Sequence, residues 1–97
     1  MKKEMSELKR AKIICNGLVQ GVGFRYFVIR HAQRIGLKGY TQNLFTSEVL
    51  TVVEGDEGLI QELIKELKVG PSHAQVNKCA VEWSDYKGEF KNFDVRY

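Results

Sequence analysis

Residues 17–25 have the sequence GLVQGVGFR, and this stretch joins two segments of different periodicity. Leading into it, Ala11 to Val19 reads as a β-strand, with apolar side chains at alternate positions. After it, Phe24 to Ile35 carries apolar residues at helical spacing, and Gly36 is suited to end a helix. We therefore predict a strand, an irregular glycine-rich turn and a helix.

The rest of the chain continues this alternation of elements. Leu37 to Asn43 and Glu48 to Glu54 are predicted strands of a hairpin. A second helix is predicted after Asp56, its candidate N-cap. The apolar stripe of this helix is Leu59, Ile60, Leu63, Ile64 and Leu67, and Gly70-Pro71 ends it. Strands are then predicted within Ala74 to Tyr86 and, after a turn at Lys87-Gly88, around Phe93, Val95 and Tyr97.

This order predicts an α+β fold of the ferredoxin-like, split βαβ type, βαββαβ plus a short C-terminal strand. Each helix has one apolar stripe to bury, so both are expected on one face of an antiparallel sheet. We predict a flexible N-terminal tail at residues 1–9 and a single domain at residues 10–97.

Composition narrows the class of protein. The chain has 97 residues and a mass of 11.1 kDa, which excludes a TIM barrel and a two-domain dinucleotide enzyme. The net charge of +3 suits a small anionic ligand, and the charges form no long basic run of the kind that binds nucleic acid. The first ten residues are charged and no stretch of 18 apolar residues exists, so we expect a cytoplasmic protein without membrane contact.

The cysteines and histidines show no metal-binding pattern. Cys15 and Cys79 are expected as small apolar strand residues, and a bridge between them is possible if their strands are neighbours. No CxxC spacing or His/Cys cluster indicates zinc. His31 is expected at the border of the core and His73 in a solvent-exposed loop.

Chemistry concentrates in the turn between the first strand and the first helix. Free N–H groups and the dipole of a helix N-terminus favour an anion there. Gly21 and Gly23 permit unusual backbone conformations and close approach of a ligand, and successive N–H groups form an anion nest. Arg25 can add a planar fork that matches two phosphate oxygens. The turn lacks the Gly-Lys-Ser/Thr of a Walker loop, and Tyr26 replaces the third glycine of a dinucleotide fingerprint.

The whole string resembles the acylphosphatase signature, Gly-x-Val-Gln-Gly-Val-x-Phe-Arg, with every fixed position present. Further elements of similarity to the family are Gly39-Tyr40 followed by Asn43, Glu54-Gly55, and the ending Phe93-x-Val95-Arg96-Tyr97. The resemblance runs from about Ile13 to Tyr97.

The resemblance implies a hydrolase that cleaves the carboxyl–phosphate bond of acyl phosphates to a carboxylate and inorganic phosphate. By motif position, Arg25 would bind the phosphoryl group and Asn43 would orient the attacking water. The family needs no metal and no organic cofactor. The backbone N–H groups that would assist Arg25 are those of Gln20, Gly21, Val22, Gly23, Phe24 and Arg25. We expect a small-molecule acyl phosphate as partner, no nucleic acid, and a monomer.

One position departs from the family pattern. Ser47 stands where the family commonly has the glycine of the hairpin turn, so the turn is expected to be wider or slightly strained. This puts in question how rigidly Asn43 is held. Phe45, at the tip, is expected either to pack locally or to flank the acyl side of the substrate.

Two alternatives stay open at this stage. One is a non-catalytic ferredoxin-like binding module that uses its sheet for nucleic acid or a protein partner. The other is a similar domain within a larger enzyme that processes carbamoyl phosphate. The short chain without appended zinc fingers favours a free-standing enzyme.

Overall fold

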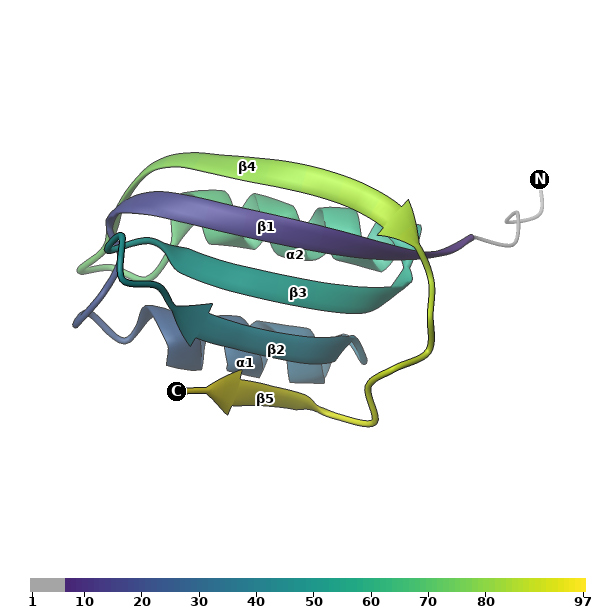
Figure 1. Cartoon of the computed structure of the whole chain (residues 1–97). Helices are drawn as coiled ribbons and strands as arrows, with labels where there is room; N and C mark the ends of the chain where they lie inside the picture. Colours follow the sequence, from purple (N-terminus) through teal and green to yellow (C-terminus); the bar gives the residue numbers. More distant parts are fainter. Residues whose placement is uncertain (1–6) are drawn as a thin grey trace.

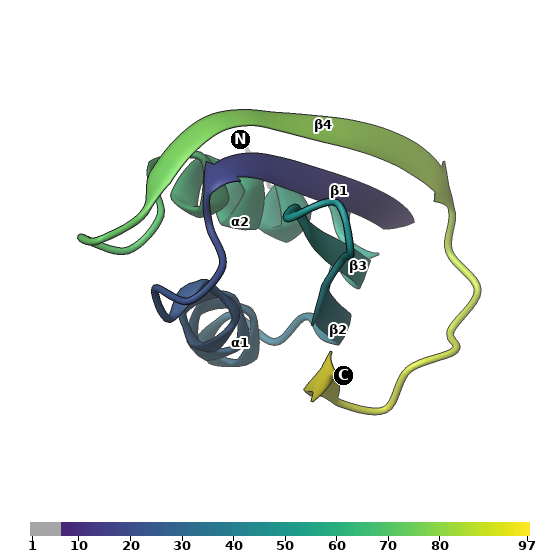
Figure 2. The same ribbon diagram turned by 60° about the vertical axis from the view of Figure 1, so that its left-hand side comes forward.

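The computed structural model describes residues 7–97, in which two helices cover one face of a five-stranded sheet (Figure 1). The view in Figure 2 separates the helix layer from the sheet layer. The predicted order of elements and the ferredoxin-like α+β fold are confirmed. The elements are β1 (Leu8–Leu18), α1 (Phe24–Arg34), β2 (Lys38–Asn43), β3 (Val49–Asp56), α2 (Glu57–Val69), β4 (Gln75–Asp85) and β5 (Phe93–Arg96).

The sheet has the strand order β4-β1-β3-β2-β5 and is mixed. The four longer strands pair antiparallel, but β5 runs parallel to β2, with Gly39 opposite Phe93. The expectation of an antiparallel sheet is therefore wrong at this edge. After β4 the chain crosses from one edge of the sheet to the other, so β5 enters beside β2 in the same direction (Figure 1).

The first strand is longer than predicted. Leu8 and Lys9, which we expected in the tail, belong to β1 and pair with Asp56 and Gly55. Residues 1–6 of the expected tail lie outside the described residues.

The core lies between the sheet and the helices. Alternate residues of β1, Ala11, Ile13 and Cys15, are buried, as their spacing in the sequence predicted. The helices bury one stripe each, made of Phe24, Val28 and Ala32 in α1 and Ile60, Leu63, Ile64 and Leu67 in α2. Burial of each large apolar side chain stabilises the fold by about 1.5–3 kcal/mol.

Local signals set the helix ends as predicted. Asp56 is the N-cap of α2, and its Oδ1 accepts a hydrogen bond of 3.1 Å from the Leu59 N–H. After α1, the N–H groups of Gly36 and Leu37 donate to carbonyls of the last turn, at 3.2 and 2.9 Å, which closes the helix with glycine in the left-handed region. Within residues 7–97, neither helix is long and apolar enough to span a membrane.

A disulfide joins an interior strand to an edge strand. Cys15 in β1 lies directly opposite Cys79 in β4, and the two form a bridge. The sequence left this bridge open as a possibility. The two cysteines are 64 residues apart, and only the pairing of their strands shows that the sulfurs meet.

A buried carboxylate holds the segment that crosses between the sheet edges. Glu54, only 1% exposed, accepts hydrogen bonds from the backbone N–H groups of Lys87 (2.7 Å) and Glu89 (3.0 Å) and from the Arg10 guanidinium (3.2 Å). Burial by itself would raise the pKa of the Glu54 carboxyl. The three donors outweigh burial, so its pKa lies below the ordinary value of 4.5.

Candidate active site

The turn between β1 and α1 takes its shape from two glycines in the left-handed region. Gly21 and Gly23 have φ angles of 74° and 80°, and a Cβ at either position would meet no atom within 4 Å. Glycine is therefore required here for its backbone conformation and not for space. Gly23 is also the N-cap of α1, without a side-chain cap, and among the described residues no backbone hydrogen bond uses its N–H or that of Val22.

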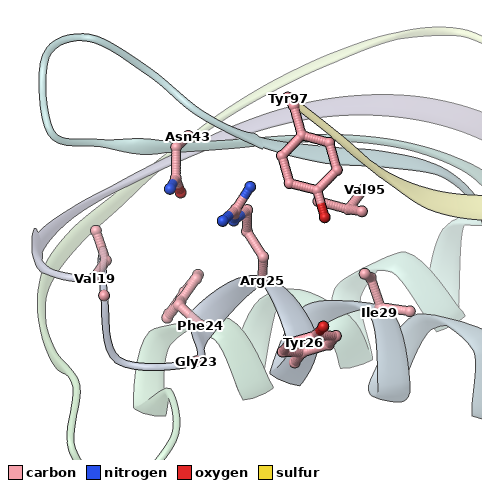
Figure 3. Close-up of a pocket in the computed structure, with 10 residues that line it drawn as sticks. Val19, Gly23, Phe24, Arg25, Tyr26, Ile29, Asn43, Val95 and Tyr97 are labelled. Atoms are coloured by element: carbon pink, nitrogen blue, oxygen red, sulfur yellow. The ribbon is translucent and has the colours of Figure 1, made fainter.

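Arg25 lies in the first turn of α1 and points its guanidinium into a pocket at this end of the sheet (Figure 3). Its Cζ lies 5.3 Å from the centroid of the Tyr97 ring, a cation–π contact. Within residues 7–97, Arg25 makes no ion pair with a carboxylate. The guanidinium is thus held in place by a ring while its hydrogen-bond donors stay available to an anion.

Asn43, the last residue of β2, faces the same pocket from the sheet (Figure 3). Its Oδ1 is buried and has no hydrogen-bond partner among the described residues. A buried acceptor without a partner is costly and calls for an explanation such as a bound water. The amide therefore offers an acceptor to a molecule in the pocket.

The pocket has a volume of about 190 Å³. It brings together five of the site residues expected from the sequence: Gly21, Gly23, Phe24, Arg25 and Asn43. Gln20 and Val22 belong to the same turn but do not line the pocket. The assignment of backbone N–H groups to phosphate binding stays a prediction.

The Gln20 side chain does not line the pocket but bonds to the β2–β3 hairpin. Its Nε2 donates to the carbonyls of Leu44 and Glu48, both at 2.9 Å, at the base of the β2–β3 hairpin turn. Leu44 directly follows Asn43. Gln20 therefore ties the turn that precedes α1 to the strand end that carries Asn43.

The hairpin turn adopts the geometry questioned above. Ser47 has a φ of 79°, the left-handed conformation that glycine adopts without strain. The turn still closes tightly, because the Leu44 N–H donates to the Glu48 carbonyl at 2.8 Å. Phe45 is fully exposed at the tip, so the expectation that it packs locally is wrong. It is not part of the pocket lining, and its expected place beside the acyl group of the substrate stays a prediction.

Sequence reasoning missed the opposite wall of the pocket. Its members are Tyr26, Ile29, Val95 and Tyr97. One signal for this wall was present, because position 29 is four residues after Arg25 and so lies on the same face of the helix. His31 packs against Phe27, with ring centroids 4.4 Å apart, and lies outside the pocket, as expected for a residue at the core border.

Fold and site together define the class of protein: a ferredoxin-like α+β domain with a cationic pocket at one end of its sheet. The sequence matches the acylphosphatase family over residues 11–95. The acylphosphatase of Geobacter sulfurreducens is 42% identical over 88 residues, which cover 91% of this chain and 97% of that protein. The acylphosphatase of Caldivirga maquilingensis is 47% identical over 89 residues, which cover 91% and 94%.

Structural similarity agrees with the sequence matches. The crystal structure of acylphosphatase from Bacillus subtilis has a TM-score of 0.88 and 33% identity, covering 93% of this chain and 99% of that chain. The chain therefore belongs to the acylphosphatase family. The expectation of an acylphosphatase enzyme is confirmed, and the alternative of a non-catalytic binding module is not favoured.

Proposed function

We propose that the pocket between the β1–α1 turn and the end of β2 is where the chain hydrolyses acyl phosphates to a carboxylate and inorganic phosphate. The observation that carries this proposal is the meeting of Arg25 and Asn43. Within residues 7–97, a guanidinium without an ion pair and a buried amide oxygen without a partner come from separate elements and face one pocket.

Arg25 and the turn would bind the phosphoryl group. The fork of the guanidinium matches two phosphate oxygens, and the N–H groups of residues 20–25 can surround the remaining charge. Since no side chain caps the helix at Gly23, these donors can bind an anion without rearrangement. Such positioning and charge stabilisation supply most of the catalysis in phosphoryl transfer.

Asn43 would hold the attacking water. Its Oδ1 accepts a hydrogen bond from the water, whose oxygen forms the new bond to phosphorus. The bond from phosphorus to the acyl oxygen breaks, and the carboxylate leaves with the electron pair. Among the described residues that line the pocket there is no histidine and no acidic side chain, so the water proton goes to a phosphoryl oxygen of the substrate.

The enzyme is proposed to act as a monomer in the cytoplasm, with an acyl phosphate as partner and without nucleic acid, membrane, metal or cofactor. In support of the monomer, one chain supplies both sides of the pocket.

Disulfides are rare in the cytoplasm. We therefore expect Cys15 and Cys79 as thiols inside the cell and as the bridge after oxidative purification.

Arg25→Gln and Asn43→Ala test the assigned roles with acetyl phosphate as substrate. Arg25→Gln should lower kcat/KM by a factor of about 10²–10³, as loss of a preorganised donor does, and should abolish competitive inhibition by inorganic phosphate. Asn43→Ala should lower kcat while the inhibition constant of phosphate stays close to that of the wild type. Phosphate release and inhibition kinetics measure both quantities.

Arg30→Gln is the matched control. Arg30 is an exposed cation of α1 that does not line the pocket, so its removal changes the net charge without touching the site. If Arg30→Gln and Arg25→Gln reduce activity equally, the pocket is not the site. If Asn43→Ala weakens phosphate binding as much as it lowers kcat, the water-holding role is wrong.

A further inference from the structure

Two hydroxyls in the core have no part in the reaction proposed above. Among the described residues, the buried side chains that are polar or charged are Thr41, Thr51 and Glu54. Glu54 holds the crossing segment, whereas the two threonines lie directly opposite each other in β2 and β3. Thr51 is also opposite the buried Ile13 of β1, so both hydroxyls lie on the face that the helices cover. Burial of a hydroxyl is unfavourable unless it is hydrogen-bonded, so this pair calls for an explanation.

The two hydroxyls form a directed chain of hydrogen bonds. The Thr41 Oγ1 donates to the Leu50 carbonyl at 3.1 Å and lies 3.1 Å from the Thr51 Oγ1. A hydroxyl carries one proton, and Thr41 uses its own on the carbonyl, so Thr51 donates to Thr41. Valine has the same branched shape and would fill the same space without this bond. The threonine pair therefore adds a directional link between β2 and β3 where packing alone would be apolar.

The carbonyl that accepts this bond lies next to the residue paired with Asn43. Asn43, the last residue of β2, is opposite Val49 in β3, and Leu50 follows Val49 directly. On the other side of Val49, the carbonyl of Glu48 accepts a hydrogen bond from the Gln20 side chain at 2.9 Å. The β3 backbone opposite Asn43 is thus held from the turn by one side chain and from the core by another.

Asn43 depends on the position of this strand end for the placement of its amide. Its Oδ1 has no hydrogen-bond partner among the described residues, and its side chain faces the pocket (Figure 3). The location of this oxygen therefore follows from where the end of β2 lies. Thr41 is two residues earlier in β2, so its side chain lies on the same face of the sheet as that of Asn43. The bond from Thr41 to β3 thus acts on the strand end that carries Asn43.

We propose that Thr41 is a positioning residue for the hydrolysis: its hydrogen bond to β3 holds the end of β2 so that the Asn43 Oδ1 faces the attacking water. The proposal rests on the proposed function, because the placement of Asn43 affects turnover only if Asn43 holds the water. Phosphate binding belongs to Arg25 and the β1–α1 turn in that function and should not depend on Thr41. The turnover number and the affinity for phosphate are therefore expected to respond differently.

The test replaces both threonines in one protein, Thr41→Val with Thr51→Val, called the valine pair below. Removal of both partners leaves neither hydroxyl unpaired, so the free energy of unfolding should be no lower than that of the wild type. With acetyl phosphate as substrate, kcat should fall about tenfold, since a misplacement of about 1 Å can slow an enzyme by about a hundredfold. The inhibition constant of inorganic phosphate should stay close to the wild-type value.

Two single variants serve as controls. Thr51→Val leaves the bond from Thr41 to the Leu50 carbonyl in place and should keep the wild-type kcat. Thr41→Ser keeps the hydroxyl but loses the buried methyl group, so it should retain kcat although the protein becomes less stable. A purely structural role would instead make kcat follow stability in every variant. Urea denaturation and steady-state kinetics measure the two quantities.

The same kinetics in an Asn43→Ala background test whether Thr41 acts through Asn43. In that background the valine pair should lower kcat no further, because no amide is left to position. An additive loss of kcat would overturn the proposal, and so would a valine pair with the wild-type kcat. A valine pair that does not fold would also overturn it, because the hydroxyls would then serve the fold itself.

The two proposals fail in different ways. If the wild type does not hydrolyse acetyl phosphate, or if Asn43→Ala leaves kcat unchanged, the proposed function of the pocket is wrong. If Asn43→Ala lowers kcat and the valine pair does not, the function stands and the positioning role of Thr41 is wrong.

Discussion

Ser47 shows how a single residue can work against the turn that contains it. Its φ of 79° lies in the left-handed region, where a non-glycine residue is destabilised by about 1–2 kcal/mol. The hairpin tolerates this because the Leu44–Glu48 hydrogen bond and the pairing of β2 with β3 hold the turn closed. The strain lies four residues from Asn43.

Ser47→Gly should therefore raise the free energy of unfolding by about 1 kcal/mol, because glycine adopts this φ without strain. The greater conformational entropy of glycine in the unfolded chain offsets part of this stabilisation. Urea denaturation followed by circular dichroism measures the change. Ser84→Gly is the control: Ser84 is exposed in β4, where glycine should destabilise the strand. A Ser47→Gly protein no more stable than the wild type would show that the turn relaxes elsewhere.

Single residues also show the limits of sequence reasoning. The role of Asn43 could be assigned only through family resemblance, because 18 positions separate it from Arg25 and their meeting depends on the pairing of β1, β3 and β2. Glu54 could not be predicted as a buried carboxylate. Its donors, Lys87 and Glu89, lie more than 30 residues further along, in a segment without periodicity.

At the scale of elements, local patterns predicted both helices and all strands. The spacing of apolar residues and the capping residues involve positions that are close together in the sequence. The position of β5 was not predictable in this way. Alternation of apolar residues shows that Phe93 and Val95 share a face, but not which edge the strand joins or in which direction. The apolar wall of the pocket was missed for the same reason, because half of it comes from the end of this strand.

The link between two elements, through Gln20, is expected to control how well Asn43 is placed. Gln20→Ala removes two hydrogen bonds to the hairpin carbonyls, which should lower the free energy of unfolding by about 1–2 kcal/mol. It should also lower kcat, because the strand end beside Asn43 loses its support. Denaturation and steady-state kinetics measure the two effects.

A double-mutant cycle separates this positioning role from general destabilisation. In an Asn43→Ala background, Gln20→Ala should lower kcat much less than it does alone, since there is no amide left to position. Gln61→Ala, at an exposed position of α2, should leave kcat unchanged in both backgrounds. Additive losses of kcat would contradict the role given to Gln20.

At the scale of the whole molecule, Glu54 and Asn43 lie at opposite ends of the β2–β3 pair, because Glu54 is opposite Lys38 at the start of β2 and Asn43 is opposite Val49 at its end. Glu54 holds the segment that carries the chain from β4 to β5, and β5 in turn leads to Tyr97 in the pocket. The carboxylate therefore anchors the segment that leads into β5.

This arrangement predicts an acid-sensitive stability. The folded protein lowers the pKa of Glu54, so below pH 4.5 the unfolded state binds this proton more readily than the folded state. The contribution of Glu54 is thus complete above its unfolded pKa and is lost as pH falls through the lower folded pKa. Glu54→Gln should lower the free energy of unfolding by about 2 kcal/mol at pH 7. As the pH falls below 4.5, the free energy of unfolding should decrease less in this variant than in the wild type.

Urea denaturation from neutral pH down to about pH 3 measures this difference, and hydrogen exchange of the Lys87 and Glu89 amides localises it. In Glu54→Gln these two amides should exchange faster than in the wild type at neutral pH, because they lose a charged acceptor. Glu82→Gln, an exposed residue of β4, should keep the wild-type dependence of stability on pH. If Glu54→Gln follows the same acid profile as the wild type, other carboxylates govern acid unfolding and the crossing segment is held without the Glu54 charge.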